Sequence, residues 1–157
     1  MTGPTPTSTP PVYWEQYQPG TKRLTGRRTI TEADITLHAC HTGDFHPYHV
    51  DAEWAKSQPF GQRIAHGTLI FSVGVGLTAT GGGENPAAFS YGYDRIRFVK
   101  PVFIGDTIQT ELTIVEKRDD PKRPDRGFVD EQGEIRNQHG ETVLVFTHIH
   151  AVDKRPA

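Results

Sequence analysis

The segment that most constrains this chain is GTLIFSVGVGLTAT, which runs from Gly67 to Thr80 and is apolar or small on every side of a helical turn. A helix without a polar face has to be buried all round, so we expect other parts of the chain to wrap it. Gly74 and Gly76 each cost about 1 kcal/mol relative to alanine inside a helix, which predicts that sheet backbone approaches closely there. We expect the three glycines at 81–83 to end the helix.

Most of the remaining chain has the composition of β-strands. Segments rich in β-branched and aromatic residues, separated by turn signals, predict strands at 22–30, 89–99, 107–115, 127–136 and 141–152. The last of these is apolar on both faces and is therefore expected inside the sheet. We expect a charged surface hairpin loop at 119–127 and a turn at 137–140. The predicted fold class is α+β, an antiparallel sheet of about five strands wrapped around a long buried central helix.

The chain of 157 residues has the length of one domain. Residues 1–12 hold four prolines and four threonines with little to bury, which predicts a disordered arm before a single domain at 13–157. A net charge of -2 gives no basic field for nucleic acid or a membrane surface, and no apolar run reaches the roughly 18 residues of a membrane span. A single cysteine, Cys40, and the lack of a secretory signal pattern favour the cytoplasm.

A carboxylate and an imidazole lie five positions apart in DFHPYH, residues 44–49. Asp44 is ionised near neutral pH, and a neutral His49 can accept or donate a proton there, so the two can hold one water molecule between them. Pro47 fixes its own φ and pushes His46 toward extended backbone, which predicts a shaped loop rather than a helical turn. These residues are candidates for acid/base chemistry on water.

Two helices are expected to flank this loop. Thr31, followed by acidic residues, predicts a helix over 31–40, and Asp51 predicts the start of a short helix that ends near residue 57. The hexapeptide alone also allows a structural interpretation. In that interpretation, Asp44 does no more than shape the turn after Gly43, and His49 is an ordinary half-buried histidine.

The motif GDFHPYH, followed by IAHGTL and later by RFVKPVFIGDT, resembles the MaoC-like acyl dehydratases, a family that includes the (R)-specific enoyl-CoA hydratases of the hot-dog fold. The resemblance runs from about residue 14 to residue 152. It implies a hot-dog fold and a hydro-lyase of acyl-CoA and fatty acid metabolism. The implied reaction is the reversible hydration of a trans-2-enoyl-CoA to an (R)-3-hydroxyacyl-CoA.

The resemblance also implies roles for individual residues. The family loop G-D-x-N-P-x-H places its catalytic pair on Asp44 and His49, and the family's oxyanion donor, the N–H of a glycine that opens the central helix, falls on Gly67. This chain has His46 where the family pattern has asparagine, which leaves the preferred acyl group open. The implied chemistry requires no metal ion and no organic cofactor.

The implied substrate and assembly add further expectations. CoA carries phosphates, and Arg63, Arg97 and Lys100 are the candidate cations for binding them. Hot-dog relatives build the acyl tunnel at a two-fold interface, so a homodimer or a larger homo-oligomer is expected, with no nucleic-acid or membrane partner.

Other functions stay open at this point. A cluster of histidines could hold zinc, although no second carboxylate or cysteine pair completes a site; the histidines are His38, His41, His46, His49 and His66. A hot-dog thioesterase would hydrolyse an acyl-CoA, and a non-catalytic acyl-thioester-binding subunit would work beside an active partner. The same residues would also serve dehydration of a carrier-protein thioester. Acyl length and pathway are not written in the sequence.

Overall fold

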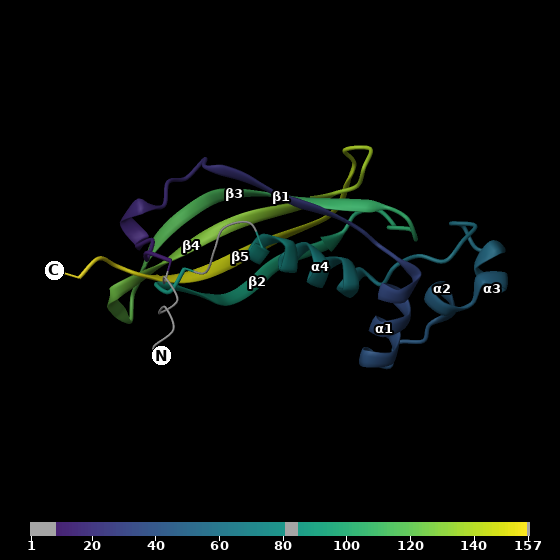
Figure 1. Ribbon diagram of the computed structural model, residues 1–157. Helices are drawn as coiled ribbons and strands as arrows, with labels where there is room; N and C mark the ends of the chain where they lie inside the picture. The colour runs from purple at the N-terminus through teal and green to yellow at the C-terminus, as the bar shows by residue number, and fades with distance from the viewer. Residues whose placement is uncertain (1–8, 81–84, 157) are drawn as a thin grey trace, which may run out of the picture.

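The computed structural model describes residues 9–80 and 85–156, and it shows one curved sheet with a long helix against one face (Figure 1). Three shorter helices gather beyond one end of the long helix, and the described part of the chain begins and ends at the opposite end of the molecule. Most of the predicted arm and the three glycines at 81–83 fall outside the described residues. Val12 exchanges hydrogen bonds with Asn85 in both directions, so the chain is attached to the domain from this residue onward.

The sheet has five antiparallel strands in the order β1-β3-β4-β5-β2, as expected for the predicted fold class. Its strands are β1 (Lys22–Thr29), β2 (Ala88–Phe98), β3 (Thr107–Asp120), β4 (Arg123–Arg136) and β5 (Thr142–Asp153). β5 lies inside the sheet between β4 and β2, which agrees with its apolar character on both faces. The turn predicted at 137–140 is present.

The charged hairpin loop predicted at 119–127 was wrong in its extent. β3 continues to Asp120 and β4 begins at Arg123, so only residues 121–122 form the turn. Charged side chains are retained in these strand ends because they pair with each other. Arg126 Nε donates to Asp120 Oδ2 at 2.7 Å, and Arg118 pairs with Asp130 at 2.5 Å.

The helices begin at residues that satisfy free backbone N–H groups. Thr31 caps α1 (Glu32–Thr42) in a reciprocal capping box with Asp34, and Asp51 caps α3 (Ala52–Lys56), as predicted. A short 3-10 helix, η1, covers Trp14–Gln16, and a four-residue helix, α2, covers Pro47–Val50. None of the described helices combines the length and the hydropathy of a membrane-spanning segment.

The long helix α4 (Gly67–Thr80) has the predicted bounds, but it is not buried all round. Leu69, Ile70 and Val73 enter the main apolar core with residues from β3, β4 and β5. Thr68, Ser72 and Gly76, which are spaced by four and therefore share one face, are exposed. The sheet wraps only part of the helix surface, and small or hydroxyl-bearing residues occupy the face that it leaves open.

The two central glycines of α4 have different surroundings. A Cβ at Gly74 would lie 2.2 Å from Ile135 Cδ1, and the Thr110 hydroxyl donates to the Gly74 carbonyl at 3.0 Å. A Cβ at Gly76 would meet none of the described atoms within 4 Å. The predicted close approach is therefore correct only at Gly74, and it is made by sheet side chains rather than by sheet backbone.

These two glycines give a matched pair of stability measurements. We expect Gly74→Ala to lower the free energy of unfolding by about 1–3 kcal/mol, because the new methyl group overlaps Ile135. We expect Gly76→Ala to raise it by up to about 1 kcal/mol, because alanine is the better helix former and has room. Urea unfolding of both variants checks this, and equal effects of the two substitutions would contradict the packing argument.

Candidate active site

The loop that carries Asp44 is shaped by the end of α1 and the start of α2. Gly43 ends α1 in the left-handed conformation, with φ of 78°, and its N–H donates to the Ala39 carbonyl. The His46 N–H donates to Asp44 Oδ1 at 3.2 Å, so the carboxylate also shapes its own turn. The turn-forming interpretation of Asp44 is therefore correct, and it leaves the second carboxylate oxygen for other partners.

The sequence predicts a loop at His49, but His49 lies on the short helix α2. Pro47 occupies the first position of this helix, where its missing N–H costs nothing, and His46 Nδ1 accepts from the Tyr48 N–H. The His46 ring also stacks on Tyr48, with ring centroids 5.4 Å apart, and meets Trp54 edge-on. The imidazole that replaces the family's asparagine therefore caps a helix and packs between aromatic rings.

The surroundings of His49 determine which ring nitrogen is free. His49 Nδ1 lies 2.8 Å from the Ile64 carbonyl, which can only accept, so Nδ1 carries the proton and Nε2 keeps its lone pair. Burial lowers the pKa of His49, the bond to Ile64 opposes that change, and the facing His66 ring lowers the pKa further. His49 is consequently neutral near pH 7 and able to accept a proton.

The structure brings Asp44 and His49 together, and it adds His66, which the sequence had suggested only as a possible zinc ligand. One carboxylate oxygen of Asp44 and one ring nitrogen of each histidine lie within 4.8 Å of one another. Two partners that each bond one water molecule at about 2.8 Å lie about 4.6 Å apart, so this spacing suits a shared water. Asp44 is exposed, His49 is half-buried and His66 is buried.

A cavity of about 390 Å³ opens beside His49 and the start of α4. Its walls are mainly apolar and include Ile64, Ile70, Val102 and Leu144. Gly67 also lines the cavity, and as the first residue of α4 its N–H has no acceptor within the helix. An apolar ligand in this cavity would therefore have a proton acceptor and a helix N-terminus next to it.

Gly67 has a packing reason to be glycine. A Cβ at this position would lie 2.7 Å from the Phe98 ring, so any side chain would displace Phe98 from the cavity wall. The family resemblance implies that the Gly67 N–H is an oxyanion donor, and the contact with Phe98 is a separate reason for glycine at this position.

The three candidate cations have different positions. Lys100 lines the cavity and pairs with Glu141 at 2.5 Å. Arg63 pairs with Glu32 at 2.7 Å, and Arg97 lies on β2, where it donates to the Ile96 carbonyl. Of the three, only Lys100 is among the described residues of the cavity wall.

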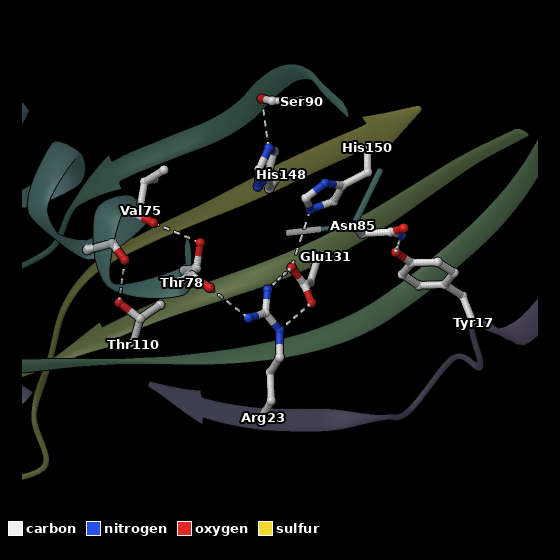
Figure 2. Close-up of polar contacts among 11 residues, drawn as sticks. Tyr17, Arg23, Val75, Thr78, Asn85, Ser90, Thr110, Glu131, His148 and His150 are labelled. Atoms are coloured by element: carbon white, nitrogen blue, oxygen red, sulfur yellow. Dashed lines mark hydrogen bonds and ion pairs between the residues drawn. The ribbon is translucent and has the colours of Figure 1, made fainter. Parts of the chain in front are cut away.

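A second polar cluster, which sequence reasoning missed, lies beside the carboxyl end of α4 (Figure 2). Arg23 donates from Nε and Nη2 to the two oxygens of Glu131 at 3.1 and 3.0 Å, and from Nη1 to the Thr78 carbonyl at 3.2 Å. His150 Nε2 lies 3.4 Å from Glu131, and His148 Nε2 bonds the Ser90 hydroxyl at 2.8 Å. The available signal was a glutamate and two histidines at alternate strand positions whose neighbours on the same face are apolar or glycine.

The surroundings of this cluster shift the pKa values of Glu131 and His148 for different reasons. Burial alone would raise the pKa of Glu131, but the contacts with His150 and Arg23 outweigh burial and lower it to about 2. Burial, reinforced by the neighbouring His150, lowers the pKa of His148 to about 3. The cluster therefore holds an ionised carboxylate and a neutral imidazole at neutral pH.

Each of the two groups of carboxylate and imidazole side chains contains enough ligand atoms for a metal ion, but the ring geometry is unfavourable in both. The rings of His49 and His66 stack at 3.7 Å with an angle of 25°, and those of His148 and His150 lie 3.7 Å apart at 41°. The lone pair of an imidazole nitrogen points outward in the ring plane, so stacked rings do not aim at one ion. Both oxygens of Glu131 are also engaged by Arg23.

Comparison with known proteins identifies the class and the family of this chain. The arrangement of a five-stranded antiparallel sheet around one helix is the hot-dog fold: a Mycobacterium tuberculosis protein, RV0216, described as having a double hotdogfold, superposes with a TM-score of 0.76 at 18% identity over 93% of this chain and 45% of that chain. The profile of the family described as MaoC like domain matches residues 15–128. The chain therefore belongs to the MaoC-like domain family.

Two relatives show how far the sequence similarity extends. Protein MaoC of Klebsiella aerogenes is 44% identical over 105 residues, 67% of this chain and 31% of that protein. The (R)-specific enoyl-CoA hydratase of Rhodospirillum rubrum is 37% identical over 90 residues, 55% of this chain and 59% of that protein. The chain thus spans less than two thirds of either relative.

Solved structures match over nearly the whole chain. The monoamine oxidase regulatory protein from Archaeoglobus fulgius has a TM-score of 0.88 at 37% identity and covers 95% of this chain and 99% of its own. The MaoC-like dehydratase from Rhodospirillum rubrum has a TM-score of 0.81 at 26% identity and covers 93% and 99%.

The contact between Arg23 and Glu131 should stabilise the fold. We expect Arg23→Met to lower the free energy of unfolding by more than the roughly 1 kcal/mol of an exposed pair, because it leaves a buried carboxylate without its donor. Lys22→Met is the matched control, since Lys22 pairs with Glu111 on the surface. Equal unfolding free energies for the two variants would contradict a stabilising role for Arg23 beside the buried Glu131 carboxylate.

The same cluster should make the fold sensitive to acid. The pKa of His148 falls from 6.5 to about 3 on folding, so its stabilising contribution is complete above pH 6.5 and is lost toward pH 3. The pKa of Glu131 falls from 4.5 to about 2, so its contribution is lost only below pH 4.5. Between pH 6.5 and pH 4.5 we expect the unfolding free energy of wild type to decrease as the pH falls, and we expect His148→Phe to show a smaller slope in urea titrations. An unchanged slope would contradict this assignment.

Proposed function

We propose that this protein catalyses the reversible hydration of a trans-2-enoyl-CoA to an (R)-3-hydroxyacyl-CoA, as a hydro-lyase. One observation carries the proposal: His49, with its Nε2 lone pair free, lines the wall of an apolar cavity that also contains the first residue of α4, Gly67. A carboxylate oxygen of Asp44 lies within 4.8 Å of a ring nitrogen of His49, so the two side chains could bond one water molecule. The family membership and the hydratase among the relatives support this choice of reaction.

In the proposed mechanism, Asp44 and His49 hold one water molecule from two sides. The water oxygen forms a bond to C3 of the enoyl group while His49 Nε2 accepts a proton from the water. The electron pair of the C2–C3 double bond moves toward the thioester, and C2 then receives that proton, from His49 directly or from Asp44 after His49 has passed it on. Hydroxyl and proton add to the same face of the double bond, and the reverse sequence is dehydration.

Negative charge develops on the thioester oxygen as the water attacks. The N–H of Gly67 is positioned for this charge, because the positive end of the α4 dipole and a backbone donor without an acceptor in the helix coincide there. An acid/base pair contributes roughly 10² to 10⁴ in rate and an oxyanion donor about 10² to 10³, so neither is sufficient alone.

The remaining parts of the proposal concern binding and assembly. The apolar walls of the cavity suit the acyl chain, and Lys100 is the best-placed partner for the phosphates of CoA, ahead of Arg63 and Arg97. We propose a homodimer, because the edge strand β2 exposes Phe89, Tyr91 and Phe98. A cytoplasmic location remains our expectation.

Two substitutions test the catalytic pair. We expect Asp44→Asn and His49→Ala each to lower kcat for hydration of crotonyl-CoA by at least about 100-fold, because each removes a group that holds or deprotonates the water. Loss of the enoyl-thioester absorbance measures the rate, and chiral analysis of the product tests the (R) configuration. Asp125→Asn on β4 and His139→Ala on the turn at 137–140, both at exposed positions, are matched controls that should keep wild-type activity.

The outcomes of that experiment separate the alternatives. Near-wild-type hydration by either Asp44→Asn or His49→Ala, with folding confirmed by thermal unfolding, would refute the assignment. Release of free thiol from a saturated acyl-CoA would favour a thioesterase instead. A folded wild type without any activity would favour a non-catalytic acyl-thioester-binding subunit, which the regulatory name of one structural relative makes worth testing.

A further inference from the structure

His66 is a buried histidine that the proposed reaction does not use. It directly precedes α4, and only 1% of its surface is exposed. Two groups of the proposed site contact it, one through a hydrogen bond and one through ring stacking. We therefore considered what this side chain does for its neighbours.

The hydrogen bond joins His66 to the loop that carries Asp44. His66 Nε2 lies 2.9 Å from the Asp44 main-chain carbonyl, across 22 positions of sequence. A carbonyl oxygen only accepts, so the proton of the neutral ring must be on Nε2. This bond attaches the Asp44 loop to the start of α4, which is the part of the helix that holds Gly67.

The ring of His66 also limits the position of His49. The two rings stack with centroids 3.7 Å apart and an angle of 25°, so His49 cannot tilt toward the core without moving His66. The ring of His38 contacts His66 at a tilt of 56°, with centroids 4.8 Å apart, and His38 Nε2 bonds the Thr68 hydroxyl at 2.9 Å. These ring contacts and the hydrogen bond to Thr68 therefore connect α2, α1 and the first turn of α4.

Stability alone does not explain a histidine at this position. His66 Nδ1 is buried and has no hydrogen-bond partner among the described residues. A buried polar atom without a partner costs about 1–3 kcal/mol, and a hydrophobic side chain of similar size would avoid that cost. The imidazole is best explained by what its other nitrogen holds in place.

We infer that His66 is a positioning residue: its Nε2–H fixes the Asp44 backbone, and its ring supports His49, so that both groups face the same point beside the Gly67 amide. This inference rests on the proposed function, since the point in question is where the water would react. Small displacements of reacting groups have large effects on rate, so losing this bond should affect turnover far more than substrate binding.

Substituting His66 with two similar amides distinguishes the effect of the hydrogen bond from the effects of side-chain size and polarity. In His66→Gln the side-chain NH₂ can occupy the place of Nε2–H, whereas in His66→Asn it can only reach the place of Nδ1. We expect His66→Asn to lower kcat for crotonyl-CoA by at least about tenfold, with KM within about threefold of wild type. We expect His66→Gln to recover most of that loss at a similar melting temperature.

The result that would overturn the inference is equally specific. Wild-type kcat in His66→Asn means that the bond does not position the site. Equal losses of kcat in both variants, in proportion to their melting temperatures, mean that His66 only fills space.

A spectroscopic measurement keeps this test separate from the proposed function. Nitrogen-15 NMR of the histidine rings should show His66 with its proton on Nε2 and a bare Nδ1, whether or not the protein hydrates enoyl-CoA. A proton on Nδ1 would remove the bond to Asp44 and overturn the inference. An inactive wild type with the proton on Nε2 would instead count against the proposed function alone.

Discussion

The close approach of α4 to the sheet at Gly74 is the contact on which the candidate site depends. Ile135 fills the space where a side chain at position 74 would lie, and Thr110 donates to the Gly74 carbonyl. This contact sets the height of the helix over the sheet at its middle. The first residue of the helix, Gly67, is thereby held beside α2, where the imidazole of His49 faces the cavity. A site built on such a fixed element keeps its geometry better than one built on loops alone.

The fold could be predicted from sequence wherever local pattern decides the structure. The bounds of α4 follow from an apolar run that begins and ends at Gly67 and Thr80, and the caps of α1 and α3 follow from Thr31 and Asp51. The β3–β4 hairpin was misjudged because its charged residues look like a loop until their partners are known. Arg126 and Asp120 stay in strands because each neutralises the other, which only the folded arrangement reveals.

The candidate site could be predicted only where its residues belong to one local sequence motif. Asp44 and His49 share one short motif, and Pro47 was itself a signal for the first turn of α2, since proline is favoured at that position. The hydrogen bond from His66 to the main-chain carbonyl of residue 44 could not be predicted from sequence, because every residue type has such a carbonyl. The Glu131 cluster depends on the register that places Glu131 opposite His148 on adjacent strands, and a single sequence does not specify that register.

The far end of α4 is also anchored, and this has a consequence for the reacting end. Arg23 donates to the Thr78 carbonyl, so a cation held by Glu131 sits against the negative end of the helix dipole. Thr78 lies eleven residues beyond Gly67, or about 16 Å along the helix axis. A helix that is held at its middle and at its last turn moves as one rigid body. A change at Arg23 or Glu131 would therefore alter how α4 is held, and its effect would reach the Gly67 amide at the cavity without any contact with a ligand.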